Sequence, residues 1–297
     1  MRVIALPKSL DNHTADVLAA GIGSWPVEGP LLVDAHATDW ASPAAFVALL
    51  TLAQAIREAG GPRPRLALPT PDVASYWAKA GFIAHADELF ELHGKVPRRK
   101  AEEQSELLLP VMPIAEIADI HTAVDRINTQ TGTLLHAELE LEASVIGGFG
   151  QSLSETCQNI LEHSGSTGWV ASHIYNYRRR LGRKVAVIAV SDGGVGFRRS
   201  LEASQAKRFG DRWDDATALE TALINNVSRF RDTGRGQGLA GTKRYLARWQ
   251  GKIAIRSGTA RLAIVPSWDD DPPMTTGLSF FPGAQVTMEV PGKEKSS

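Results

Sequence analysis

The sequence predicts an α/β protein with a small domain at residues 1–97 and a larger α/β sandwich at residues 111–297. Three observations support this prediction. Strand-like and helix-like segments alternate in the first region, a basic and polar segment follows it, and three polar or glycine-rich motifs lie in the second region.

The first region contains two apolar runs that predict strands, at Leu31–Asp34 and Arg65–Leu68. Two segments with helical spacing of apolar residues follow them, at Pro43–Ala59 and Asp72–Ala80. Strands that alternate with helices in this way are typical of a small α/β domain.

The boundary between the two regions is predicted at residues 98–110. Arg98, Arg99 and Lys100 lie in this stretch, which resembles a solvated interdomain linker. Helical patterns then run from Ile114 to Ile127 and from Leu134 onward. We expect the first of these helices to pack on its own sheet, and a partner or homodimer contact is the alternative.

The first motif is ETCQNILEHS, at residues 155–164. In an α-helix, side chains spaced by four residues share one face, so Glu155, Asn159 and His163 are predicted to project together. The opposite side carries an apolar stripe formed by Leu153, Cys157, Ile160 and Leu161. A solvated polar face is the simpler interpretation of this helix taken alone.

The second motif is SDGGVGF, at residues 191–197, and it follows a buried strand predicted at Val185–Val190. Asp192 ends that strand, where its carboxylate could accept a hydrogen bond from an exocyclic amine. Three glycines follow it, Gly193, Gly194 and Gly196, and they would allow a ligand to approach the backbone closely. Phe197 would then cover the ligand with an apolar side chain. A glycine-rich hairpin turn is the alternative.

The third motif is TGRGQGL, at residues 233–239, just before a helix-like segment at Leu239–Gln250. Its glycines, Gly234, Gly236 and Gly238, surround Arg235 and Gln237. Backbone amides at the start of a helix form an anion site suited to phosphate, and the arginine could add a charged contact. A flexible linker is the alternative.

In order and spacing, the three motifs resemble the N, G1 and G2 boxes of the GHKL ATPase superfamily, which includes gyrase, histidine kinases and MutL-type proteins. The resemblance implies that Asn159 ligates Mg²⁺, that Glu155 polarises an attacking water or hydroxyl, and that Asp192 binds the adenine amine of ATP. It assigns the remaining nucleotide contacts to His163, Gly194, Gly196, Phe197, Gly234, Arg235, Gly236, Gln237, Gly238 and Leu239.

The segment Pro282–Pro291 resembles the last strand of that family, with one departure. A threonine usually follows the strand's glycine, and Ala284 occupies that place here, while Thr287 is expected to face the other side. The predicted helix at Ala216–Phe230 and the loop after it correspond to the ATP lid. Its short length is similar to that of histidine kinases and anti-sigma-factor kinases.

The first region loosely resembles the STAS domain of anti-sigma-factor antagonists, over residues 33–60 and 76–82. Ser42 lies near the phosphorylatable serine of that family, but Pro43 replaces the expected glycine. A helix-capping serine is the interpretation we favour.

Composition agrees with a soluble, cytoplasmic protein. The formal net charge of -1 suggests neither nucleic acid nor an anionic membrane as a partner, and no apolar run is long enough to span a bilayer. The single cysteine, Cys157, excludes an intrachain disulfide. HExxH, GxSxG and P-loop motifs do not occur, which disfavours zinc, serine-hydrolase and P-loop chemistry.

We therefore expect a cytoplasmic regulatory protein with a Mg-ATP pocket and a STAS-like regulatory domain. It would phosphorylate a serine or threonine of a protein partner, or hydrolyse ATP slowly, as anti-sigma-factor kinases do. The alternative is a nucleotide-gated protein-binding module without productive catalysis. A histidine kinase fragment is disfavoured because His121 and His136 lack the sequence context of a phosphoaccepting histidine.

Overall fold

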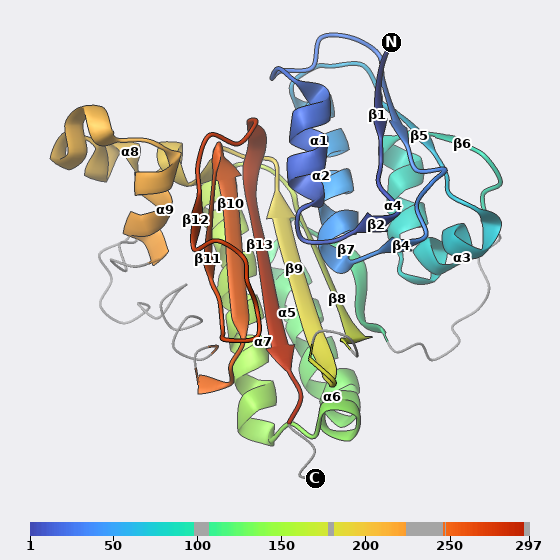
Figure 1. Cartoon of the computed structure of the whole chain (residues 1–297), viewed down its shortest axis with the longest axis vertical. Coiled ribbons are helices and arrows are strands. Elements are labelled where there is room, and N and C mark those ends of the chain that lie inside the picture. The colour runs from blue at the N-terminus through green and yellow to red at the C-terminus, as the bar shows by residue number, and fades with distance from the viewer. Residues whose placement is uncertain (98–106, 178–180, 224–245, 247, 294–297) are drawn as a thin grey trace.

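The computed structural model describes residues 1–97, 107–177, 181–223, 246 and 248–293 (Figure 1). The chain is mixed α/β, as predicted. Its elements form four layers, in which a small sheet, a helical layer, a large sheet and a second helical layer follow one another.

The small sheet has four parallel strands in the order β1-β3-β5-β6. Each crossover steps in the same direction, and right-handed crossovers then place every connecting helix on one face of the sheet. The strands predicted at residues 31–34 and 65–68 and both predicted helices are confirmed to within two residues. The elements of this region are β1 (Arg2–Ala5), β2 (Ser9–Leu10), α1 (Thr14–Ile22), β3 (Leu31–Asp34), β4 (Trp40–Ala41), α2 (Pro43–Glu58), β5 (Arg65–Ala67), α3 (Pro71–Lys79), α4 (Phe82–Leu89) and β6 (Glu91–His93).

Helix α2 is the centre of the molecule. Ser42 caps it by accepting a hydrogen bond from the backbone N–H of Ala45 at 3.3 Å, and Pro43 occupies the first turn. The capping interpretation of Ser42 is therefore confirmed, and its side chain is buried. The sequence predicts an amphipathic helix here, but every residue from Pro43 to Ile56 is buried, Thr51 and Gln54 included. Both sheets contribute to this burial, because α2 lies between them (Figure 1).

The large sheet has seven antiparallel strands in the order β12-β11-β10-β13-β9-β8-β7. The strand predicted at residues 185–190 and the last strand are both confirmed. Residues 107–110, which the sequence placed in the linker, belong instead to β7, because the backbone of this segment pairs with β8, Leu107 with His173 and Leu109 with Ser172. The strands are β7 (Leu107–Ile114), β8 (Gly168–Asn176), β9 (Lys184–Asp192), β10 (Lys252–Gly258), β11 (Ala260–Ile264), β12 (Met274–Thr275) and β13 (Phe281–Pro291).

One face of the large sheet is covered by helices from its own region, and these confirm the helical patterns predicted after residue 114. They are α5 (Ile117–Asp125), the π-helical turn η1 (Arg126–Thr131), α6 (Gly132–Leu139), α7 (Ala143–Asn159) and the π-helical turn η2 (Ile160–Ser164). Val170, Ile188 and Val190 point into this helical core.

The other face of the large sheet packs against the N-terminal region. Side chains that alternate with those of the helical core, Trp169, Ala171 and Ala189, join one continuous core with α2 and the small sheet. Phe281 belongs to the same core and is fully buried. The two predicted regions therefore share apolar surface on this face of the sheet.

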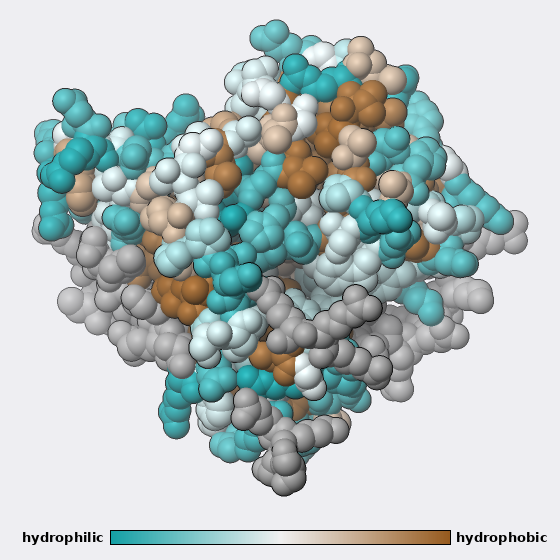
Figure 2. All heavy atoms as spheres, in the orientation of Figure 1, coloured by the Kyte–Doolittle hydropathy of each residue, from teal (hydrophilic) through white to brown (hydrophobic). Residues whose placement is uncertain are grey.

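Helix α8 (Gly196–Phe209) projects from the end of β9 and is followed by the 3₁₀ turn η3 (Gly210–Arg212) and α9 (Asp215–Leu223) (Figure 1). Leu201 is the buried residue of α8, and the surface over this helix is mainly hydrophilic (Figure 2). Helix α9 confirms the start of the helix predicted at 216–230, whose last residues lie outside the described part. Within the described residues, no helix has the length and apolar character needed to cross a membrane.

Candidate functional site

The candidate site is organised around Asp192, at the end of β9. Its neighbours in the sheet are Gly168 on β8 and Ala284 on β13. The carboxylate is only 7% exposed, and its Oδ1 accepts a hydrogen bond from the backbone N–H of Gly194 at 2.9 Å. Burial raises the pKa of Asp192 to about 7, although backbone hydrogen bonds from Gly194 and Ala284 oppose the shift. A carboxyl group with this pKa is divided between its two protonation states near neutral pH.

Glycines surround Asp192 because larger residues would not fit. A β-carbon at Gly283, which has a φ of +68°, would overlap the backbone oxygen of Asp192. One at Gly168 would overlap the side chain of Ile160, the first residue of the turn η2. These two positions let the strand end, the helix end and the last strand approach each other closely.

The Asp192 loop, residues 192–197, leads from β9 into α8. The hairpin-turn alternative is therefore wrong, since a helix and not a strand follows the glycines. A β-carbon at Gly194 would overlap the backbone of Ser164, whose oxygen accepts a hydrogen bond from Val195 N–H at 3.1 Å. The loop is thus joined directly to the end of the first motif.

The first motif forms the last turns of α7 and the π-helical turn η2. Leu153, Cys157 and Ile160 are buried, which confirms the predicted apolar stripe. Glu155 and Asn159 lie on the other side and are half-buried, so they are not simply a solvated face. Burial raises the pKa of Glu155, and a hydrogen bond involving Gln151 opposes this shift.

His163 is the exception in this motif. The predicted common face assumed α-helical spacing, but residues 160–164 form a π-helical turn with wider i→i+5 hydrogen bonding. The spacing therefore holds from Glu155 to Asn159 and does not extend to residue 163. The side chain of His163 lies outside the described part of the structure.

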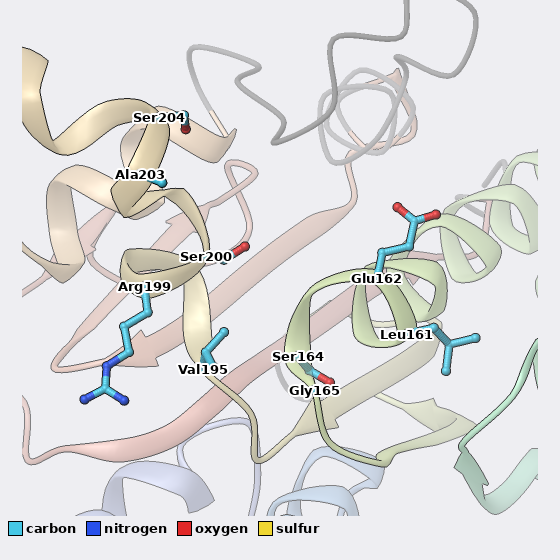
Figure 3. Close-up of a pocket in the computed structure, with 9 residues that line it drawn as sticks. All are labelled: Leu161, Glu162, Ser164, Gly165, Val195, Arg199, Ser200, Ala203 and Ser204. Atoms are coloured by element: carbon cyan, nitrogen blue, oxygen red, sulfur yellow. The ribbon is translucent and has the colours of Figure 1, made fainter.

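A cavity of about 430 Å³ lies between η2 and α8 (Figure 3). The two elements face each other across it, with Ser164 on one side and Ser200 on the other. Glu155, Asn159 and Asp192 do not line it, and the lining begins two residues after Asn159, at Leu161, and three residues after Asp192, at Val195. Its lining consists of Leu161, Glu162, Ser164, Gly165, Val195, Arg199, Ser200, Ala203 and Ser204.

The α8 residues at this cavity were not predicted as site residues. The sequence did carry a signal for them, because Arg199, Ser200 and Ser204 directly follow the second motif in a segment with few apolar residues. Phe197 begins this helix and is half-buried, packed between the helical core of the large sheet and a small cluster under α8.

Ser257 on β10 is a second residue that the sequence did not indicate. Its hydroxyl donates to the backbone oxygen of Gly283 at 3.0 Å and accepts from Phe197 N–H at 3.1 Å. Gly196, with φ of +70°, leaves the space for it, since a β-carbon there would lie 2.7 Å from the Ser257 oxygen. Residue 257 belongs to no motif, so only the folded sheet brings it to the loop.

The sheet shows which residue occupies the position where the GHKL resemblance predicts a threonine. Ala284 lies beside Asp192, whereas Thr287 pairs with Ala189 on the face covered by α2, as expected from strand alternation. No threonine hydroxyl is thus offered at residue 284 or from residue 287.

The remaining predicted residues, Gly234–Leu239, lie outside the described residues. Among the residues that are described, no group of three His, Cys, Asp or Glu side chains gathers as a metal site.

Comparison of the sequence with protein-family models and with curated proteins gives no match.

Proposed function

We propose that residues 111–297 form a GHKL-type domain that binds adenine nucleotide with Mg²⁺. The observation that carries this proposal is the environment of Asp192. A carboxylate that is almost fully buried ends a central strand and is enclosed by positions that admit only glycine. It lies next to the helix end that carries Glu155 and Asn159.

The oxygen atoms of Asp192 and Asn159 suit the chemistry of a magnesium-bound adenine nucleotide. A buried carboxylate oxygen can accept a hydrogen bond from the exocyclic amine of adenine. This bond replaces the one that the amine loses to water when it becomes buried. The Asn159 amide oxygen is a hard ligand suited to Mg²⁺, which would neutralise charge on the phosphates.

Glu155 is the candidate general base. Half-burial raises its pKa, so its carboxylate is a stronger proton acceptor than a fully solvated glutamate. It would take the proton from a water molecule or from a serine or threonine hydroxyl of a protein partner as that oxygen attacks the γ-phosphate. Its place one helical turn before Asn159 puts it on the same side of α7 as the metal ligand.

The regulatory role rests on the packing of the N-terminal region against the large sheet. The same packing favours a second candidate function, a nucleotide-gated binding module, because a change at the nucleotide site could reach the N-terminal region without any chemistry. The fate of the γ-phosphate separates the two functions.

Calorimetric titration with Mg-ATP tests the binding proposal. We expect Asp192→Asn to weaken binding by about 1–3 kcal/mol, because the adenine amine then meets a group that does not offer the same charged acceptor. Asp72→Asn, at an exposed position in the first turn of α3, is the matched control and should bind as the wild type does. Unchanged affinity in Asp192→Asn would contradict the adenine assignment, and no binding to the wild type would contradict the family.

Phosphate release and transfer to protein test the catalytic role. Glu155→Ala is expected to keep ATP affinity within a few-fold and to lower turnover by roughly 10²-fold or more, the usual scale for loss of a general base. Glu88→Ala, at an exposed position on α4 outside the cavity, is the control. If the wild type binds ATP and never turns it over, the nucleotide-gated module is the better account.

A further inference from the structure

Helix α2 contacts both sides of the Asp192 position from the opposite face of the large sheet. Thr51, Ala55 and Glu58 follow one face of this helix, at spacings of four and three residues. Each of them meets a residue beside Asp192 or in the turn that holds the Asp192 loop. None belongs to the region that carries the nucleotide motifs.

The first contact fixes the end of β9. The Thr51 hydroxyl donates a hydrogen bond to the hydroxyl of Ser191 at 2.8 Å, and both side chains are fully buried. Ser191 immediately precedes Asp192 and points to the α2 face, so this bond sets the position of the strand end. A buried hydroxyl that loses its partner has no water to replace it.

The second contact fixes the start of the Asp192 loop. A β-carbon at Gly193 would lie 2.9 Å from the β-carbon of Ala55, closer than real side chains approach. Gly193 does not have the positive φ that marks Gly196. Its glycine is therefore required by the proximity of α2 and not by backbone conformation.

The third contact reaches the turn after the first motif. Ser166 donates a hydrogen bond to the Glu58 carboxylate at 2.8 Å. The same turn is held by Ser164, which accepts from Ser166 N–H at 3.0 Å and whose backbone oxygen accepts from Val195 N–H. Glu58 is thus connected to the Asp192 loop through the hydrogen bonds of Ser166 and Ser164.

We propose that α2 is the regulatory input to the nucleotide site, with Thr51, Ala55 and Glu58 as positioning residues for the Asp192 loop. A displacement of α2, caused by a protein partner bound to the N-terminal region, would move the loop and change nucleotide affinity. Nucleotide binding would in turn shift α2, since coupling between two sites is reciprocal. What the site binds rests on the proposed function, whereas the coupling between α2 and the loop does not.

A double-mutant cycle at the second contact tests this proposal. Gly193→Ala should displace the loop, increasing hydrogen exchange of amides 193–197 and weakening ATP binding about 10-fold or more, the scale of an overpacked contact. Ala55→Gly removes the opposing β-carbon, so the double variant should recover both properties to within about threefold of the Ala55→Gly protein. Gly29→Ala, where an added β-carbon meets no atom within 4 Å, is the matched control.

Rescue is the decisive observation, because a variant that is merely less stable would not recover when a second destabilising change is added. A folded Gly193→Ala protein with wild-type exchange in the loop would overturn the proposal, and so would a double variant that shows no recovery. If Gly193→Ala does not fold, Thr51→Val takes its place. It removes the hydroxyl at nearly constant volume, and Thr51→Ser, which keeps the hydroxyl, should behave as the wild type does.

Exchange is measured without nucleotide, so the coupling and the proposed function are tested separately. A wild type that binds no ATP while the exchange cycle shows rescue would contradict the nucleotide assignment and retain the role of α2. ATP binding that is identical in all variants, with unchanged exchange, would retain the nucleotide assignment and overturn the role of α2.

Discussion

The N-terminal region meets the large sheet through two contrasting contacts. On the β8 side the contact is aromatic and neutral. The ring of His173 packs against Phe46, and its Nδ1 lies 2.9 Å from the hydroxyl oxygens of both Tyr76 and Tyr175. On the β10–β11 side the contact is ionic, and Asp16 of α1 pairs with Arg256 and Arg261.

The two contacts differ in how they accommodate a buried ionisable side chain. The neutral contact avoids charge, because burial lowers the pKa of His173 to about 3 and keeps the imidazole uncharged. The ionic contact keeps its charges and pairs them. Burial opposes ionisation of Asp16, but hydrogen bonds from His13 and Arg256 outweigh it and lower the pKa of Asp16 to about 2. Both contacts should therefore weaken in acid, the neutral one below pH 6.5 and the ionic one only below about pH 4, and salt should screen the ionic contact alone.

Removing the Asp16 carboxylate should disrupt the ionic contact and lower the free energy of unfolding more than any other change considered for the two contacts. Asp16→Ala leaves Arg256 and Arg261, which are 4% and 8% exposed, without their carboxylate. Uncompensated buried charge typically costs about 3–5 kcal/mol of unfolding free energy, and backbone acceptors at Gly258 and Ser279 hold Arg256, so we expect about 3 kcal/mol. Urea unfolding measures it, with Asp72→Ala as the control. A loss below about 1 kcal/mol would show that the arginines find other partners.

Acid should weaken the neutral contact. The folded-state pKa of His173, about 3, lies below its ordinary value of 6.5, so the unfolded chain binds the extra proton between these values. The free energy of unfolding is then highest above pH 6.5 and should fall by about 1 kcal/mol between pH 7 and 5.5 through this group. His173→Gln should remove that part of the pH dependence, while the exposed-site variant His36→Gln should keep it. An unchanged slope in His173→Gln would assign the effect to another group.

His13 should act in the opposite direction and by less. Its hydrogen bond to Asp16 raises its pKa, although burial opposes the shift, so its contribution to stability is complete below pH 6.5 and is lost as pH rises through the higher folded-state value. We expect His13→Gln to lower the urea midpoint at pH 6 and to have little effect at pH 8.5. His121→Gln, at an exposed position on α5, is the control. Equal effects at both pH values would mean that the imidazole acts only through packing.

Much of the secondary structure was predictable because it follows local rules. Apolar runs predicted β3, β5 and β9, the resemblance of Pro282–Pro291 to the last GHKL strand predicted β13, and the 3.6-residue period predicted α2, α3, α5 and α7. Asp192 was predictable as a strand-end carboxylate, since it follows shortly after the apolar run Val185–Val190. The π-helical turn at 160–164 was not predictable. Its i→i+5 hydrogen bonds replace those of an α-helix, but its residues are of the same types as those found in α-helices.

The sequence by itself determined that α2 is a helix. A serine cap, a proline in the first turn and apolar residues at helical spacing predict it, and the structure shows that it is buried on every side. Only the tertiary structure decided what would cover it. The hydrophobic effect has no direction, so an apolar helix requires burial without specifying a partner. The close fit of Ala55 against Gly193, and of Ser257 against Gly283 and Phe197, exists only once the two sheets enclose α2 and the strands are in register.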